Sequence, residues 1–435
     1  MAGIEPEFKG SFERTLLRIL LHKYENSRAF RSGSELTRPP RCSMADAAFC
    51  DDYFDEMDFR KRQWMNEVLI DLEKAGIVRV RWERFREGEA AETVLLAPSG
   101  VAAAYRRAGL RPKSEKLERL KELLRPLSDH PWPEVRAWRD AALRRMAESK
   151  TAPPELDADD PEAARDLVAA LAALPQAEAR PTLKRLFSLH VYRDSKRFEQ
   201  SVEARLAGLL RRLRGLDDVS DEDVLDSVGI MRAPKPVLLA GPVRLRAAGR
   251  TIDLAGFADG TALFPETVFA VEAVEGDVDR IVTIENLTSY YLWVRHRAGG
   301  PGGDGPGRRE LAVYTGGFPG RTLQRFFDAL ASWRDAAGLR RRPDVWHWGD
   351  IDLGGIRIAA FLRERWFPDL VAVKMDRDTL FAHRTEATPL SSAYARRVRE
   401  ALDAGTFAGW RDVLGAMLEL GVRLEQEVVE AWNEI

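Results

Sequence analysis

The first part of the chain combines helical patterns with two strand patterns. Residues 12–24 and 58–75 each place their apolar side chains along one face of a helix, and Gly76 is suited to end the second helix. Apolar and polar residues then alternate over residues 77–82 and 92–96, which is typical of the two strands of a hairpin. Helices followed by a hairpin predict a winged-helix module.

Helical spacing continues through the middle of the chain. It covers residues 106–173, is broken at Pro153-Pro154 and the acidic run that follows, and indicates a spacer or docking arm. A further helical unit begins at Arg180 and ends in a basic amphipathic helix that runs to Arg214.

After residue 228 the pattern changes to short apolar runs that indicate strands. We expect strands within residues 236–246, 251–254, 279–284, 311–314, 345–349 and 370–376. Helical patterns occupy residues 321–330 and the stretch from Ile356, and two helices close the chain, the last of which is expected to carry residues 423–427. Strand, turn, helix and strand in succession predict βαβ units and a parallel sheet.

Acidic residues stand directly after two of these strands: Glu285 follows one, and Asp350 and Asp352 follow another. Because parallel strands deliver their carboxyl ends to one edge of a sheet, we expect these residues and Thr315–Gly317 to meet in one crevice. In an extended chain the two aspartates would point to one face about 7 Å apart, which a hydrated divalent cation can bridge. Carboxylate oxygens favour Mg²⁺ or Mn²⁺. Two solvated acids in a turn would give the same motif, which also occurs in phosphatases and sugar transferases.

Two pairs of glycines lie beside this predicted metal site. Gly354 and Gly355 allow a tight turn into the following helix, whose N-terminal amides favour a phosphate, and Gly316 and Gly317 occupy the turn after another strand. We therefore expect all four to lie near a bound phosphate.

Basic residues suggest two surfaces for nucleic acid. A chain of 435 residues with 45% hydrophobic content has room for several domains, and its net charge of −2 leaves 67 Lys and Arg residues that can gather on particular faces. Solvated helix faces are the alternative interpretation of these charges. The candidate DNA-binding residues are Arg60, Arg62, Arg79, Arg81, Lys196, Arg197, Arg205 and Arg211.

Other features indicate the cellular setting and a buried histidine. Cys42 and Cys50 suit a reducing cytoplasm, and the absence of a signal peptide or a long apolar run predicts an intracellular protein. The Gly- and Pro-rich residues 298–309 predict a mobile surface loop near the crevice. His347, between two tryptophans in an expected buried strand, is interpreted as a core residue. The sequence leaves open whether Asp376, Glu425 or Glu427 joins the site.

The C-terminal motifs resemble a Toprim domain, the metal-binding fold of topoisomerases, primases and some nucleases: Glu285 in IVTIEN is followed by the Asp350 and Asp352 pair. From about Arg180 to Ile435 the order of LLAGPVRLR (a glycine-bearing strand pair), TIEN, YTGGFPGR and GDIDLGG is similar to the topoisomerase VI A subunit. DSKRFE, GDIDLGGIRI and RLEQE most resemble the JetD family, the nuclease subunits of bacterial Wadjet anti-plasmid systems.

Together, the residue patterns of the first 178 residues and this resemblance predict a multidomain α+β fold. Its expected parts are a winged-helix module in residues 1–110, a helical arm in 111–178, a CAP-like winged-helix module with connecting strands in 179–270, and an α/β Toprim domain with a parallel sheet in 271–435. The resemblance also implies a homodimer acting on circular double-stranded DNA with an SMC-type ATPase, its kleisin and an accessory subunit, and no membrane partner.

The resemblance implies DNA hydrolysis as well. The topoisomerase helix carries a tyrosine that attacks DNA, whereas the matching segment here, Thr182 to Ser188, has Phe187 and Ser188 in place of a tyrosine pair. We therefore expect a metal-dependent endonuclease that forms no covalent tyrosyl intermediate. Two alternatives remain: a catalytically silent DNA-docking scaffold, and topoisomerase-like transesterification, for which Tyr192 is the available tyrosine.

Overall fold

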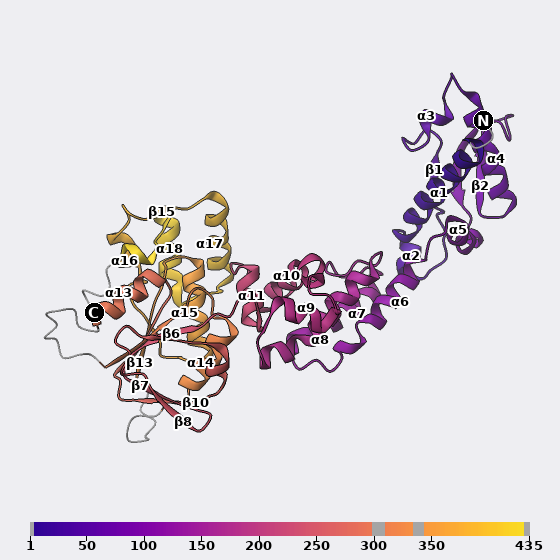
Figure 1. The fold of residues 1–435 in the computed structure, drawn as a ribbon. Helices are drawn as coiled ribbons and strands as arrows, with labels where there is room; N and C mark the ends of the chain where they lie inside the picture. The colour runs from indigo at the N-terminus through magenta and orange to yellow at the C-terminus, as the bar shows by residue number, and fades with distance from the viewer. Residues whose placement is uncertain (1–3, 298–308, 334–342, 430–435) are drawn as a thin grey trace. The chain divides into compact units, whose positions relative to one another are not determined.

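A computed structural model describes residues 4–297, 309–333 and 343–429 of the chain (Figure 1). The fold is a mixture of helices and several sheets, and the chain divides into two compact units, residues 1–168 and 169–435. Of the loop expected at residues 298–309, only Arg309 lies within the described residues. No helix in these ranges is both long and apolar enough to cross a membrane.

The N-terminal unit contains a three-stranded antiparallel sheet in the order β1-β3-β2, packed against helices. Its elements are α1 (Ile4–Glu25), α2 (Arg28–Ser32), β1 (Arg41–Ser43), α3 (Cys50–Tyr53), α4 (Phe59–Lys74), β2 (Val78–Trp82), β3 (Ala91–Leu96), the 3₁₀ turns Pro98–Gly100 and Arg125–Leu127, α5 (Val101–Ala108), α6 (Lys113–Leu123), α7 (Pro133–Glu148) and the start of α8 (Pro161–Ala179).

The apolar stripes predicted for this unit form its core. Leu16, Leu17 and Leu20 of α1 and Leu69 of α4 are completely buried, and the expected hairpin is confirmed as β2 and β3. β1 was not predicted, because three residues are too few to show an alternating pattern. The described elements fit helices followed by a hairpin, and the winged-helix assignment stays a prediction.

The C-terminal unit contains most of the strands. After α8 its elements are β4 (Thr182–Leu183), α9 (Lys184–Tyr192), a π-helical turn (Phe198–Val202), α10 (Glu203–Arg214), α11 (Asp221–Ser227), β5 (Ile230–Met231), β6 (Val237–Ala240), β7 (Val243–Ala247), β8 (Arg250–Asp253), β9 (Thr261–Leu263), α12 (Pro265–Phe269), β10 (Val271–Gly276), β11 (Arg280–Ile284), α13 (Leu287–Arg297), β12 (Glu310–Tyr314), α14 (Arg321–Leu330), β13 (Asp344–Trp348), α15 (Leu353–Arg365), β14 (Val371–Ala372), α16 (Arg377–Ala382), β15 (Thr388–Pro389), α17 (Ser392–Ala404), a 3₁₀ turn (Ala408–Trp410), α18 (Arg411–Leu420), β16 (Val422–Arg423) and a 3₁₀ turn (Gln426–Val428).

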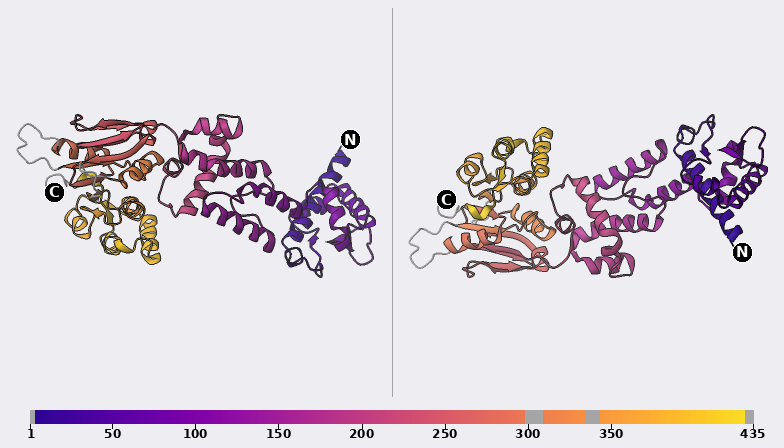
Figure 2. Two further views of the ribbon diagram at one scale, coloured as in Figure 1. Left: turned by 90° about the horizontal axis from the view of Figure 1, so that it is seen from below. Right: turned by 90° about the horizontal axis from the view of Figure 1, so that it is seen from above.

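The main sheet of this unit has six strands in the order β14-β13-β11-β12-β6-β9. β14, β13, β11 and β12 pair in parallel, as the strand and helix patterns predicted, whereas β6 and β9 are antiparallel. The helices α17 and α18, in yellow, lie on one side of this unit, and the strands β7, β8 and β10 lie on the opposite side (Figures 1 and 2).

Two sequence-based expectations for this unit were wrong. LLAGPVRLR is no strand pair: β6 joins the six-stranded sheet and β7 joins a separate sheet in the order β10-β7-β8. At Gly241, between them, a Cβ would lie 2.3 Å from the carbonyl oxygen of Glu310, so only glycine allows this close passage. Residues 423–427 are not on the last helix, because Gly421 adopts a left-handed conformation (φ 67°) that ends α18 at Leu420.

A buried ion pair joins the segment after α10 to the helices around the main sheet. Asp218 accepts a hydrogen bond from Nη2 of Arg357 on α15 at 2.9 Å, and it also pairs with Arg397 of α17. The side chains of Asp218 and Arg357 are only 9% and 11% exposed, so the buried charge of Arg357 depends on Asp218 for compensation.

Candidate functional site

The ends of β11 and β13 bring Glu285 and Asp350 together. The register pairs Ile284 with Trp348, so Glu285 lies opposite Gly349. The backbone amide of Glu285 donates to the carbonyl of Trp348 at 3.1 Å, and Oε2 of Glu285 accepts from the amide of Asp350 at 3.2 Å. The amide of Thr315 donates to the carbonyl of Ile284 at 2.8 Å, so the end of β12 reaches the same edge. The predicted meeting of these three strand ends is confirmed.

The two acids are held in an environment that opposes their ionisation. Burial, with the nearby charges of Asp350 and Asp352, raises the pKa of Glu285 to about 8. Burial also raises the pKa of Asp350 to about 7; the hydrogen bond from the amide of Gln426 opposes this rise, and the charges of Asp352, Glu425 and Glu427 add to it. Without a cation, the ionised carboxylates would repel one another, and little positive charge would be present to compensate them.

Asp352 has contacts within the protein that its spacing did not predict, and its role as a metal ligand stays a prediction. Its Oδ1 atom accepts from the amide of Gly355 at 2.9 Å and thereby caps α15, and its Oδ2 atom lies 3.4 Å from Nη1 of Arg423. The hydroxyl of Tyr394 accepts from the amide of Leu353 at 2.9 Å. Protein groups thus satisfy two amides at the start of α15, and phosphate binding beside Gly354 and Gly355 stays a prediction.

A segment from the end of the described chain completes the acidic cluster. Asp350, Glu425 and Glu427 each place a carboxylate oxygen within 4.8 Å of the others. Asp350 Oδ1 accepts from the amide of Gln426 at 2.7 Å, and Leu424 forms a bridge with Ile351. We call Glu285, Asp350, Asp352, Glu425 and Glu427 the carboxylate cluster.

Gln426 anchors this segment to both strand ends. Its side chain is 1% exposed; Nε2 donates to the carbonyl of Trp348 at 3.1 Å, and Oε1 accepts from the amide of Asn286 at 2.8 Å. The side-chain amide of Asn286 in turn donates to Glu427 at 2.5 Å. One sign of this arrangement is present in the sequence: Gly421 follows an apolar helix, and a left-handed glycine there allows the chain to turn back toward the sheet.

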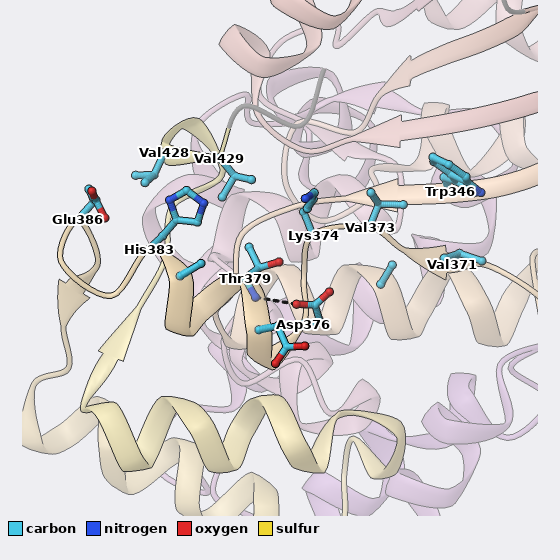
Figure 3. Close-up of a pocket in the computed structure, with 13 residues that line it drawn as sticks. Trp346, Val371, Val373, Lys374, Asp376, Thr379, His383, Glu386, Val428 and Val429 are labelled. Carbon is cyan, nitrogen blue, oxygen red and sulfur yellow. Dashed lines mark hydrogen bonds between the residues drawn. The ribbon is translucent and has the colours of Figure 1, made fainter. Parts of the chain in front are cut away.

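The other candidate residues lie outside the carboxylate cluster. Gly316 and Gly317 have positive φ angles of 65° and 91°, so the turn after β12 requires them, while their contact with phosphate stays a prediction. Asp376 caps α16 by accepting from the amide of Thr379 at 2.7 Å. It lines a pocket of about 910 Å³ at the β14 edge of the sheet, together with Lys374, His383 and Val428 (Figure 3).

The candidate DNA-binding residues differ in exposure and in whether they have an acidic partner. Arg60 is paired with Asp58 at 2.8 Å, and Arg211 is paired with Asp221, so each has an acidic partner. Among the other six, the exposed ones are Arg79, Arg81, Lys196 and Arg205, and the half-buried ones are Arg62 and Arg197. DNA contact by all eight stays a prediction.

Two family models match the sequence. The model described as Wadjet protein JetD, C-terminal, matches residues 239–434, and the model described as the N-terminal part of an uncharacterized protein conserved in bacteria (DUF3322) matches residues 14–211. A Bacillus cereus (strain Q1) protein named "Wadjet protein JetD" is 31% identical over 420 residues, covering 96% of this chain and 98% of that protein. The chain belongs to the JetD family. The C-terminal JetD match includes the whole carboxylate cluster, from Glu285 to Glu427.

Proposed function

We propose that this member of the JetD family is a metal-dependent DNA endonuclease of a Wadjet anti-plasmid system. The observation that carries the proposal is the carboxylate cluster, in which strand ends and a returning C-terminal segment place acidic groups together at partial burial. Uncompensated carboxylates at such distances destabilise one another, so their assembly favours a bound cation.

The donor set fits a hard divalent cation such as Mg²⁺ or Mn²⁺. All candidate ligand atoms are carboxylate oxygens, with Asp350, Glu425 and Glu427 nearest to one another. A cation bound there would supply Lewis-acid polarisation of a phosphodiester and a more acidic water. The proposed ligands are Glu285, Asp350 and Asp352, as the resemblance implied, with Glu425 and Glu427 as additional candidates from the geometry.

The protein groups around the cluster have distinct proposed roles. The amides of Asp350 and Gln426 orient the carboxylates of Glu285 and Asp350, which limits the reorganisation needed when charge changes at the site. Arg423, between Asp352 and Glu425 at 3.4 Å and 3.3 Å, supplies the nearest positive charge and holds the strand-end and C-terminal acids in one arrangement.

The helix matched to the topoisomerase tyrosine helix supports hydrolysis over transesterification. Phe187 and Ser188 of α9 are 3% and 0% exposed. The hydroxyl of Ser188 donates to the carbonyl of Asp194 at 2.5 Å and accepts from the amide of Phe198 at 3.0 Å. Both hydrogen bonds stabilise the fold, so this hydroxyl is not available as a nucleophile. Tyr394, which lies beside Asp352, is a poor nucleophile because burial raises its pKa to about 12.

The proposed partners follow from the family. We expect a homodimer whose two sites face the two strands of one duplex, in a bacterial cytoplasm, with an SMC-type ATPase, its kleisin and an accessory subunit delivering closed circular DNA. A double-strand cut needs two sites, and a single chain presents one carboxylate cluster among its described residues. A strictly monomeric mass, alone and with DNA, would contradict this assembly.

Calorimetry with MnCl₂ on the purified chain tests the site directly. Wild-type protein and the surface control Glu400→Gln, from the exposed face of α17, are expected to bind Mn²⁺, whereas Asp350→Asn is expected to lose binding. In the reconstituted system, Asp350→Asn and Glu285→Ala should abolish plasmid cutting and leave the circular dichroism spectrum unchanged. Undiminished cutting by either variant would refute the nuclease assignment.

The same experiments separate the two alternatives. Absence of Mn²⁺ and Mg²⁺ binding to wild-type protein, with normal assembly on DNA, would favour a catalytically silent scaffold. A covalent protein–DNA adduct that disappears in Tyr192→Phe would favour transesterification.

A further inference from the structure

His347 is a completely buried titratable side chain to which the proposed reaction gives no role. It lies on β13 directly opposite Thr283 of β11, and both side chains are 0% exposed. Glu285 and Gly349 follow two residues later, directly after β11 and β13, so the side chain of Glu285 continues the alternation that places it on the same face as Thr283 and His347. His347 therefore lies near Glu285, on the side of the carboxylate cluster that is toward the interior of the sheet.

The hydrogen bonds fix which ring nitrogen of His347 carries the proton. The hydroxyl of Thr283 donates to the carbonyl of Trp346 at 3.1 Å, so its only hydrogen is already used. Oγ1 of Thr283 lies 2.9 Å from Nδ1 of His347 and must accept there, which places the ring hydrogen on Nδ1. His347 is completely buried, which opposes a second, charged proton on the ring, so the imidazole is neutral and Nε2 carries a lone pair.

Nε2 of His347 and the carboxyl group of Glu285 both lie close to Gly349. A Cβ atom added to Gly349 would lie 2.9 Å from Nε2 of His347 and 2.6 Å from Oε2 of Glu285, so both atoms converge over this one residue. Among the described residues Nε2 has no hydrogen-bond partner. When Glu285 is ionised, above about pH 8 or beside a bound cation, both atoms are acceptors; two acceptors that converge in a buried place require a donor between them, since an unpaired buried polar atom is costly.

We propose that His347 is a positioning residue for Glu285, with Nε2 accepting one hydrogen of a water molecule whose other hydrogen goes to Oε2 of Glu285. The amide of Asp350 donates to the same oxygen, so this carboxylate oxygen is fixed from two sides and the other is directed to the crevice. The proposed water-mediated hydrogen bond between His347 and Glu285 is inferred from the positions of these two side chains. Its effect on metal binding rests on the proposed function.

A purely structural histidine would behave differently. In that case the ring would only join β11 to β13 through Thr283, and Nε2 would be insensitive to changes at Glu285. A positioning role and a purely structural role of His347 can be distinguished in the metal-free protein, because that test does not depend on catalysis.

The first experiment measures the ring nitrogens by NMR above pH 8, where Glu285 is ionised, in chains labelled with ¹⁵N-histidine and perdeuterated. We expect the His347 signals to show a proton on Nδ1 and a hydrogen-bonded acceptor at Nε2, and the Nε2 signal to move in Glu285→Ala but not in the control Glu400→Gln. The signals are assigned by their loss in His347→Asn. A proton on Nε2, or an Nε2 signal that Glu285→Ala leaves in place, would overturn the proposal.

The second experiment measures the consequence with Mn²⁺ alone. His347→Asn keeps an amide donor near Thr283 but removes Nε2, and Thr283→Val removes the group that fixes the tautomer; each is expected to weaken Mn²⁺ binding about tenfold. Urea denaturation of the metal-free variants serves as the structural readout. Unchanged Mn²⁺ affinity in a folded His347→Asn protein would contradict the proposed link to metal binding. If wild-type protein itself binds no Mn²⁺, the proposed function fails, and the nitrogen signals still decide whether His347 positions Glu285.

Discussion

The carboxylate cluster predicts that the metal-free protein loses stability as the pH rises. Burial, with its acidic neighbours, raises the pKa of Glu285 from its ordinary value of 4.5 to about 8, and burial raises that of Asp350 from 3.8 to about 7. Between the ordinary and the raised values, the folded state therefore holds protons that the unfolded chain has released. Stability from these groups is fully present below about pH 4 and is lost progressively until about pH 8.

The size of the effect follows from these values. One pKa unit corresponds to about 1.4 kcal/mol, and pH 7 lies about 2.5 units above the ordinary pKa of Glu285 and below its raised pKa, so this group costs the metal-free protein about 3 kcal/mol relative to acid conditions. Glu285→Gln, which resembles the protonated acid at every pH, should be more stable than wild type by about that amount at pH 7 and equally stable near pH 4.

The assay is urea denaturation between pH 4 and 8 in the presence of EDTA, followed by tryptophan fluorescence. Trp348, beside Glu285, is 1% exposed and should report unfolding of the C-terminal unit. Saturating Mn²⁺ at pH 8 should restore the stability of wild type more than that of Glu285→Gln. The surface variant Glu400→Gln serves as the control and should follow the wild-type pH profile. A metal-free wild type whose free energy of unfolding is flat or rises from pH 5 to pH 8 would refute the reasoning.

Three further predictions concern the support of the site and its use. Asp218→Ala should lower the free energy of unfolding of the C-terminal unit by about 3 kcal/mol, because it leaves Arg357 buried without its anion; a loss below 1 kcal/mol in urea denaturation would contradict this. Gly421→Ala should cost about 1 kcal/mol through its left-handed backbone and also weaken Mn²⁺ binding in calorimetry, because this turn carries Glu425 to Asp350. Its matched control is Gly415→Ala, within α18, where an added Cβ meets no atom within 4 Å. Cleavage by the reconstituted system should favour closed circles over linear DNA and show no consensus in sequenced ends, since the DNA-binding candidates suggest recognition of shape; a sharp motif at the breaks would refute it.

Local pattern was sufficient to predict the central part of the site. Short apolar runs followed by acids identified β11 and β13, and the common direction of parallel strands predicted that Glu285 lies next to Asp350. The same reasoning identified His347 as a core residue, because a strand between covered faces buries its side chains. These features depend on the spacing of apolar residues, which a sequence displays directly.

Only the tertiary structure decided which other acids belong to the cluster and what Asp352 does. Gln426 bonds Asp350 across 76 residues of sequence, and this contact brings Glu425 and Glu427 to the strand ends, although the segment was expected to lie on a helix. Asp352 was expected to point with Asp350 into a metal site; the structure adds that its Oδ1 atom caps α15, while metal ligation by Asp352 stays a prediction. Periodicity shows which face of an element is buried, because it depends only on the spacing of apolar residues. Which segments pair with each other, here Ile351 with Leu424, depends on contacts between residues far apart in the sequence, and these are stable only in the folded chain.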